Sequence, residues 1–166
     1  MLVAAVGCQG SASKSSQAAP IEVRDGKGAV VASVRRGNPC RATFGTTQLE
    51  VAGGKLETGS SSWSTEKRQN GTAMLRDGEM VARVLASADD LDVIDPKGIA
   101  MARISRMQGH LSIGDAGSRR LRDGSKTAIG IAVGDLMVTG TDDLLTAGLV
   151  ASPEVPPEVR ALAMCE

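Results

Sequence analysis

The sequence predicts a mainly β protein, an antiparallel hairpin meander or barrel with one or two short C-terminal helices. Three observations predict this fold class. A unit made of a short apolar strand, a turn with Asp and Gly, and a second apolar strand recurs along the chain. Small aliphatic residues alternate with other residues through the second strands, as a half-buried strand requires. Apolar residues at helical spacing follow only near the C-terminus.

The first residues differ in character from the rest of the chain. Residues 1–7 form an apolar, signal-like segment that ends in small residues directly before Cys8. The stretch Ala5-Val6-Gly7-Cys8 resembles the lipobox of bacterial lipoproteins, with Ala5 where that family prefers Leu. The resemblance implies that Cys8 carries lipid. A secretion signal also needs a basic n-region, which is missing here. Either the start lies upstream of Met1, or the segment is an apolar strand or chain end of a cytosolic protein.

Residues 8–20 are rich in Ser, Ala, Gly and Gln and predict a flexible tether ahead of a single β-rich domain at 21–166. Gln9 follows the cysteine, where some bacteria use Asp to retain lipoproteins in the inner membrane. The resemblance therefore implies an outer-membrane lipoprotein of the bacterial envelope that faces the periplasm. Its partners would be the membrane, through the lipid anchor, and an unidentified protein or cell-wall component.

Cys40 and Cys165 remain once Cys8 is assigned to lipid, and an even pair in an oxidising compartment predicts a disulfide. Their bond would close most of the domain into one loop, which the chain-entropy model values at roughly 5 kcal/mol. The bond requires Cα atoms within about 7 Å of each other. Two unrelated buried thiols are the alternative.

The turns of the repeated hairpins are the most informative part of the sequence. Asp-Gly turns tolerate the positive φ that tight hairpins need, and Asp can hydrogen-bond its own backbone two residues on. The copies are unevenly spaced, which favours a meander or barrel over a solenoid. We predict turns at Asp25-Gly26, Asp77-Gly78, Asp95 with Gly98, and Asp123-Gly124.

The second strands place three residues each on one face: Val30, Ala32 and Val34; Met80, Ala82 and Val84; Ala100, Ala102 and Ile104. The central alanines suggest close approach by another element, such as a helix. Further strands are expected at 41–44, 47–51, 110–113, 126–133 and 135–138. The Ser-rich segment 60–70, which holds Trp63, reads as a loop.

Two short helices are expected after residue 140. Thr141 is a candidate N-cap, and Pro157 occupies a tolerated first-turn position. In the second helix, Val159, Leu162 and Ala163 share one face. A hairpin meander followed by an apolar helix resembles the tubby C-terminal-like fold, in which a closed barrel surrounds a buried helix. The resemblance implies a lipid-facing role and a buried helix made of Leu144, Leu145, Leu149 and Val150.

Composition narrows the function classes. The chain has 19 Lys and Arg against 19 Asp and Glu, so no overall field steers it towards nucleic acid. One Trp, one Phe and no Tyr provide no stacking platforms for single strands. No apolar run reaches the roughly 20 residues that span a bilayer. We expect no nucleic-acid partner and no transmembrane helix.

The sequence contains no catalytic or metal-binding signature that we recognise. His110 is the single histidine, whereas a general base needs an orienting partner and a metal site needs several ligands. The acidic run at 89–95 lacks the ligand order of a calcium loop. We expect no metal and no cofactor.

Three hypotheses of function follow. The first is an envelope lipoprotein with a non-catalytic binding or structural domain. The second is a tubby-like lipid-handling domain with a buried C-terminal helix. The third is an enzyme that uses scattered carboxylates and His110.

Overall fold

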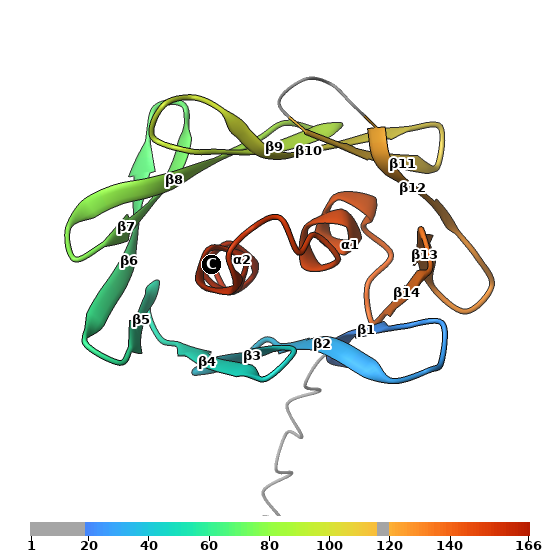
Figure 1. Ribbon diagram of the computed structural model, residues 1–166, viewed down its shortest axis with the longest axis horizontal. Coiled ribbons are helices and arrows are strands. Elements are labelled where there is room, and N and C mark those ends of the chain that lie inside the picture. Colours follow the sequence, from blue (N-terminus) through green and yellow to red (C-terminus); the bar gives the residue numbers. More distant parts are fainter. Residues whose placement is uncertain (1–18, 116–119) are drawn as a thin grey trace, which may run out of the picture.

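The protein is mainly β, as the sequence predicts. A computed structural model describes residues 19–115 and 120–166; Cys8, the signal-like segment and nearly all of the predicted tether lie outside the described residues. Within the described part, 14 strands form one antiparallel sheet that curls into a nearly closed barrel, and two short helices follow (Figure 1).

The strands pair in chain order around the barrel, and β14 returns to pair with β1. The sheet is incomplete only between β4 and β5, where an isolated bridge joins Ala52 and Lys55. The elements are β1 (Ile21–Arg24), β2 (Val30–Arg35), β3 (Cys40–Phe44), β4 (Thr47–Val51), β5 (Lys55–Thr58), β6 (Ser61–Arg68), β7 (Gly71–Arg76), β8 (Glu79–Ala86), β9 (Asp90–Ile94), β10 (Ala100–Met107), β11 (His110–Gly114), β12 (Arg120–Lys126), β13 (Ile131–Val133), β14 (Leu136–Thr139), α1 (Leu144–Val150) and α2 (Pro157–Met164).

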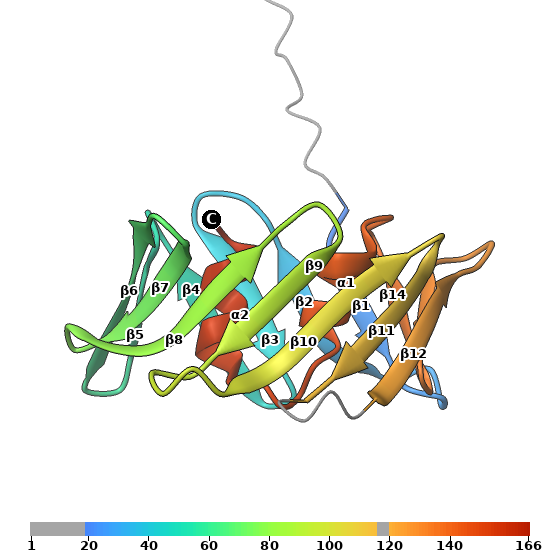
Figure 2. The same ribbon diagram turned by 90° about the horizontal axis from the view of Figure 1, so that it is seen from above.

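Because neighbouring strands run antiparallel, successive connections alternate between the two ends of the barrel. Figure 2 shows the C-terminus at what we call the upper end, where residue 20 also enters β1. The upper end carries the connections 36–39, 52–54, 69–70, 87–89, 108–109, 127–130 and 140–143. The lower end carries the turns 25–29, 45–46, 59–60, 77–78, 95–99 and 134–135, together with the loop 151–156 between the helices.

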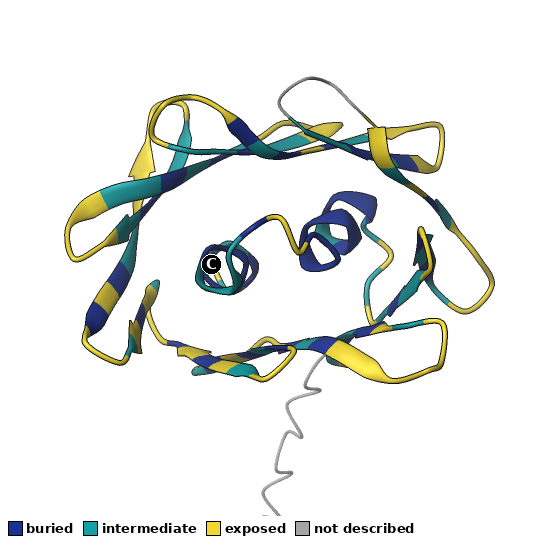
Figure 3. Ribbon diagram, in the orientation of Figure 1, coloured by how far each residue is buried: buried dark blue, intermediate teal, exposed yellow. Residues whose placement is uncertain are grey.

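Both helices lie inside the ring of strands (Figure 1). Helix α1 packs against β10 to β13, and α2 packs against β3 to β6. Most residues of both helices are buried (Figure 3). In α1, a Cβ on Gly148 would lie 2.6 Å from Ile104 Cγ2 of β10, so a glycine is needed for this close approach. The two helices therefore fill the interior of the barrel.

Two expectations for the helices need correction. The N-cap of α1 is Asp143, which accepts a hydrogen bond from the Thr146 amide; Thr141 instead accepts one from the Asp143 amide at 3.2 Å. In α2, burial is not confined to the predicted face, because Arg160 and Ala161 are buried as well. A helix inside a barrel has wall on every side, so amphipathic spacing does not describe it. No helix of the described part is long and apolar enough to cross a membrane.

The predicted turns at the lower end follow two designs. Asp25 and Asp95 each accept hydrogen bonds at 2.8–2.9 Å from the amides two and four residues ahead. In these turns the residues with positive φ are Gly28 and Gly98, at 82° and 83°. Gly26 also lies in its turn, but its φ is not positive. Asp77 and Gly78 form a two-residue turn with φ of 52° and 85°. Asp-Gly chemistry thus sets the lower rim of the wall.

The turn predicted at Asp123-Gly124 is wrong. Both residues lie inside β12, where Gly124 pairs with Leu111 on one side and Val133 on the other. A Cβ on Gly124 would lie 2.6 Å from the Ala132 carbonyl oxygen, so this glycine permits close packing within the sheet. The strand predicted at 126–133 is correspondingly interrupted by the turn at 127–130.

The loop predicted at 60–70 is also wrong. Residues Ser61–Arg68 form β6, and Lys55–Thr58 form β5, a strand that is not among those predicted. Trp63 is buried, and its indole N–H donates to the Thr58 hydroxyl at 3.0 Å. Half of the residues of β6 are exposed, so its composition is that of a loop although its hydrogen bonding is that of a strand.

The second strands of the three hairpins share a bulge that the sequence pattern does not predict. Each has one extra residue directly before the central alanine: Val31, Val81 and Met101. From the alanine onward the predicted face holds, since Ala82 and Val84 are buried and Arg83 between them is not. Ahead of the bulge it fails in two of the three strands, since Val30 is exposed and Met80 is half-buried, whereas Ala100 is buried as predicted. A bulge redirects side chains locally, and Val81 and Met101 pack against the core.

Candidate functional site

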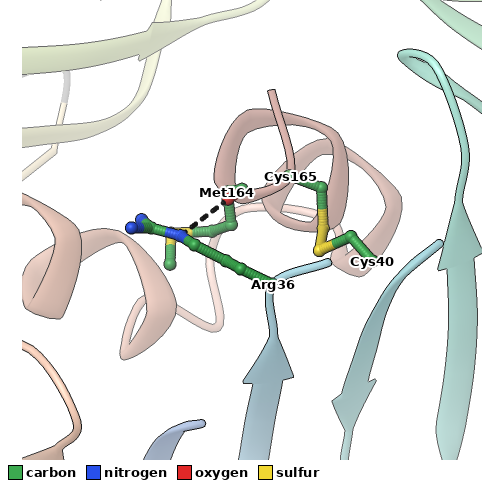
Figure 4. Close-up of a disulfide and its surroundings, with 4 residues drawn as sticks. All are labelled: Arg36, Cys40, Met164 and Cys165. Carbon is green, nitrogen blue, oxygen red and sulfur yellow. Dashed lines mark hydrogen bonds between the residues drawn. A yellow bond between two sulfur atoms is a disulfide. The ribbon is translucent and has the colours of Figure 1, made fainter. Parts of the chain in front are cut away.

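The disulfide lies at the upper end of the barrel. Cys40 and Cys165 form the predicted disulfide. Their Cα atoms are 5.8 Å apart, within the limit of about 7 Å that such a bond requires. Beside the bond, the Arg36 side chain donates to the Met164 carbonyl oxygen at 3.3 Å (Figure 4). These contacts tie the end of α2 to the start of β3. Their role is structural.

The N-terminus of α1 is held at the same end. Arg106 Nη1 of β10 lies 3.7 Å from Asp143 Oδ1, and the Thr146 amide donates to Asp143 Oδ2 at 2.9 Å. Burial, the largest single effect, raises the pKa of the Asp143 carboxyl. Hydrogen bonds from Thr146 and Leu145 together with the charge of Arg106 outweigh it, so that the pKa is lowered overall.

The residues considered for catalysis or metal binding do not converge. His110 is exposed at the start of β11 and lines a shallow surface pocket of about 420 Å³, in which Asp123 is the only carboxylate. That carboxylate lies 3.2 Å from Arg120 Nε. In the acidic run, Asp89 and Asp92 pair with arginines of β10. Within 19–115 and 120–166, no group of three His, Cys, Asp or Glu residues is placed to hold a metal ion.

An apolar pocket of about 370 Å³ opens at the lower end of the barrel. Strands β1 to β3 contribute Val23, Val31 and Phe44 to its wall. The segment from the end of α1 to the start of α2 contributes further apolar residues, among them Val150, Pro153 and Pro157, and one charged side chain, Arg160. Its volume is near the lower limit of small-molecule pockets, roughly 300–1,000 Å³.

Arg160 is the unusual member of this pocket. It lies in the first turn of α2 and is only 8% exposed. Its Nη1 donates to the Val150 carbonyl oxygen at 3.0 Å, and its guanidinium carbon lies 4.1 Å from the centre of the Phe44 ring. Its Nε is buried and has no hydrogen-bond partner among the described residues. Burial lowers the pKa of Arg160 to about 10, so the side chain remains charged at neutral pH.

Two acidic residues near Arg160 in the chain, Glu154 and Glu158, favour its charged form, but neither forms an ion pair with it in the described part of the chain. Glu154, in the loop between the helices, accepts two hydrogen bonds from Arg122 Nη2 of β12, at 2.6 and 2.9 Å. Arg122 Nη1 also donates to the Ala151 carbonyl oxygen at 2.6 Å. This arginine therefore fixes the loop to the wall and holds the Glu154 carboxylate in an ion pair. No carboxylate lies within ion-pair distance of Arg160 in the described part of the chain.

Sequence reasoning missed this site entirely. The sequence pattern places Phe44 only in a strand, and it gives Arg160 no role between the apolar residues of its helix. A signal was present, because residues 159–164 read Val-Arg-Ala-Leu-Ala-Met. An arginine in so apolar a helix becomes informative once the helix is known to lie inside a barrel, where no face reaches open solvent.

The lining of the pocket defines what it can do. Its walls are apolar, it holds one cation, and His, Cys, Ser and carboxylate residues are absent from the lining of this described pocket. It offers no group for proton transfer or nucleophilic attack, but it suits a ligand with an apolar body and a negative group. No protein-family model, curated protein or solved structure matches the chain.

Proposed function

We propose that this chain is a bacterial envelope lipoprotein whose barrel is a non-catalytic binding domain. The lipid on Cys8 would anchor it, and the pocket beside Arg160 would be its ligand site. The observation that carries the proposal is the apolar pocket with a buried arginine that lacks a carboxylate partner. Burying a charge without a carboxylate partner costs free energy, which the hydrogen bond to Val150 and the contact with Phe44 offset only in part, so a role in binding gives a reason for it.

The positions of the two ends support this assignment. The chain coming from Cys8 enters the barrel at the upper end, and the pocket opens at the lower end. Residues 9–20 reach at most roughly 40 Å when fully extended. An anchor at Cys8 would therefore hold the domain near the membrane and leave the pocket accessible from the periplasm. The disulfide fits the same location, because such bonds persist in oxidising compartments.

Fractionation of cells that express Cys8→Ser tests the anchor. The unchanged protein should sediment with membranes, and the variant should move to the soluble fraction because it cannot accept lipid. Gln9→Asp is the matched control: it keeps the lipidated cysteine, so the protein should stay with membranes. Equal partitioning of the unchanged protein and Cys8→Ser would contradict the anchoring proposal.

A second candidate function is lipid handling by a tubby-like domain, with α1 as the functional element. It is favoured by the burial of Leu144, Leu145, Leu149 and Val150 inside the barrel. Co-sedimentation of the Cys8→Ser chain with phospholipid vesicles separates the two candidates. Vesicle binding that persists in Val31→Phe, which narrows the pocket, would favour this second function over the pocket.

A further inference from the structure

We infer that the pocket beside Arg160 binds a single-chain anionic amphiphile such as an alkyl carboxylate, with the chain against the apolar wall and the carboxylate on the guanidinium. The inference rests on the proposed function only in taking this pocket as the ligand site. It does not depend on the lipid anchor.

The charge of the ligand follows from the state of Arg160. A buried cation is costly unless it is paired, and proteins seldom leave one without a partner. A guanidinium has five N–H donors, of which a single one donates to a described residue here. Its planar fork matches a carboxylate in a bidentate pair. Glu154 and Glu158 favour the charged form of Arg160 from beyond ion-pair distance, and Glu154 is hydrogen-bonded to Arg122. A ligand carboxylate would supply the direct partner that Arg160 lacks.

The number of negative charges on the ligand follows from the cations that lie near the pocket. Arg122 is the other cation close to this end of α2, and Glu154 already neutralises it. A ligand with several negative charges would therefore find only one free cation. The surrounding wall consists of aliphatic and aromatic carbon, which a polar ligand such as a sugar or nucleotide would leave unsatisfied. The site fits one negative charge attached to hydrocarbon.

The shape of the ligand follows from the volume and the rim. About 370 Å³ accommodates one alkyl chain and is too small for a two-chain lipid. The mouth is apolar, because Val31 lines the pocket and is still 36% exposed. Its neighbour Val30 is 48% exposed but does not line the pocket. The bulge at Val31 turns this one residue of the pair towards the pocket.

Calorimetric titration of the full-length Cys8→Ser chain tests the ligand class. The probes are dodecanoate, dodecanol and butyrate, each below its aggregation concentration. Dodecanoate should bind about tenfold or more tighter than dodecanol, because a hydrogen bond to a charged group is worth at least that factor. It should also bind tighter than butyrate, because the short chain leaves most of the wall uncovered. Arg160→Met should abolish the preference for dodecanoate over dodecanol, and Arg41→Met, at an exposed site on β3, should retain it.

A second pair of variants keeps Arg160 intact. Val31→Phe should weaken dodecanoate binding by about tenfold or more, because the ring occupies the mouth of the pocket. Val30→Phe is the matched control and should stay within about twofold of the parent, as expected for a surface change. If thermal melting shows that Arg160→Met does not fold, the comparison of Val31→Phe with Val30→Phe still tests whether dodecanoate binds in the pocket.

Three results would overturn the inference. The first is no dodecanoate binding by the folded Cys8→Ser chain. The second is equal affinity for dodecanoate and dodecanol, which would remove the role of Arg160. The third is butyrate binding as tightly as dodecanoate, which would remove the alkyl chain from the ligand class while leaving the pocket as an anion site. None of these results bears on fractionation, so failure of the anchor remains distinguishable.

Discussion

The two ends of the barrel are closed by different kinds of contact. At the upper end, residues far apart in the chain hold the helices to the wall: Cys40 with Cys165, Arg36 with Met164, and Arg106 with Asp143. At the lower end, much of the rim is made of short turns whose hydrogen bonds join residues two to four positions apart, and a long-range contact of Arg122 with Glu154 and Ala151 fixes the loop between the helices. There, too, a buried arginine is left without a carboxylate.

This difference indicates a division of roles within one small domain. The disulfide and the ion pair at the upper end fix the helices, which favours stability. The lower end keeps an unpaired charge next to an apolar pocket, which costs stability and suits binding. Substitutions at the upper end should therefore change the free energy of unfolding most. Substitutions around the pocket should change ligand affinity more than folding.

The largest effect is expected from the disulfide. Cys165→Ser should lower the free energy of unfolding by about 2–5 kcal/mol, because the bond joins residues 125 positions apart and restricts the unfolded chain. Urea denaturation measures the change. The Cys8→Ser variant is the control and should match the parent.

Reduction provides a second comparison for the same bond. Dithiothreitol should shift the unfolding midpoint of the parent protein to that of Cys165→Ser and leave the variant unchanged. A parent that unfolds identically with and without reductant would show that the upper end does not depend on this bond, and the contrast between the ends would lose its main support.

A smaller effect is expected from a turn at the lower end. Gly78→Val should destabilise the fold by about 1–3 kcal/mol, because Gly78 has φ of 85° and β-branched residues rarely adopt positive φ. No atom lies within 4 Å of the position that a Cβ would take, so the cost comes from the backbone alone. Thermal unfolding of Gly78→Asn is the matched control, since Asn tolerates this conformation. Equal losses for Val and Asn would mean that positive φ is not the cause.

The contrast between the ends also explains which features the sequence could predict. The turns at Asp25, Asp77 and Asp95 depend on residues that are close in the chain, so the sequence predicts them. Asp123-Gly124 has the same residues but lies within β12. Leu111 and Ala132 of the neighbouring strands leave no room for a side chain at Gly124. The residues next to Gly124 in the chain do not predict this packing between strands.

The candidate site was hidden for a related reason. The burial of Arg160 depends on a barrel that closes around α2, with Phe44 supplied by β3. From the sequence alone, an arginine in a short helix reads as a solvated side chain. Parity of the cysteines suggested the pair Cys40 and Cys165, but parity gives no distance. Long-range packing decides both features.

The smallest effect concerns Asp143 and depends on pH. Because the pKa of Asp143 is lowered in the folded protein, its carboxylate stabilises the fold above the unfolded pKa of about 3.9 and ceases to do so as pH falls through the folded pKa. Asp143→Asn keeps a good N-cap residue but removes the charge facing Arg106. It should cost less than about 1 kcal/mol at pH 7, since the pair is partly exposed.

Urea midpoints at pH 7, 5, 3 and 2 measure this dependence. The difference between the parent and Asp143→Asn should be largest at pH 7 and should shrink below pH of about 4, where the parent carboxylate takes up a proton. Asp142→Asn, at the exposed neighbouring position, is the control and should show a smaller difference at pH 7. A gap that widens as pH falls would mean that burial dominates at Asp143, and that the upper end, like the lower, holds a charge at a cost.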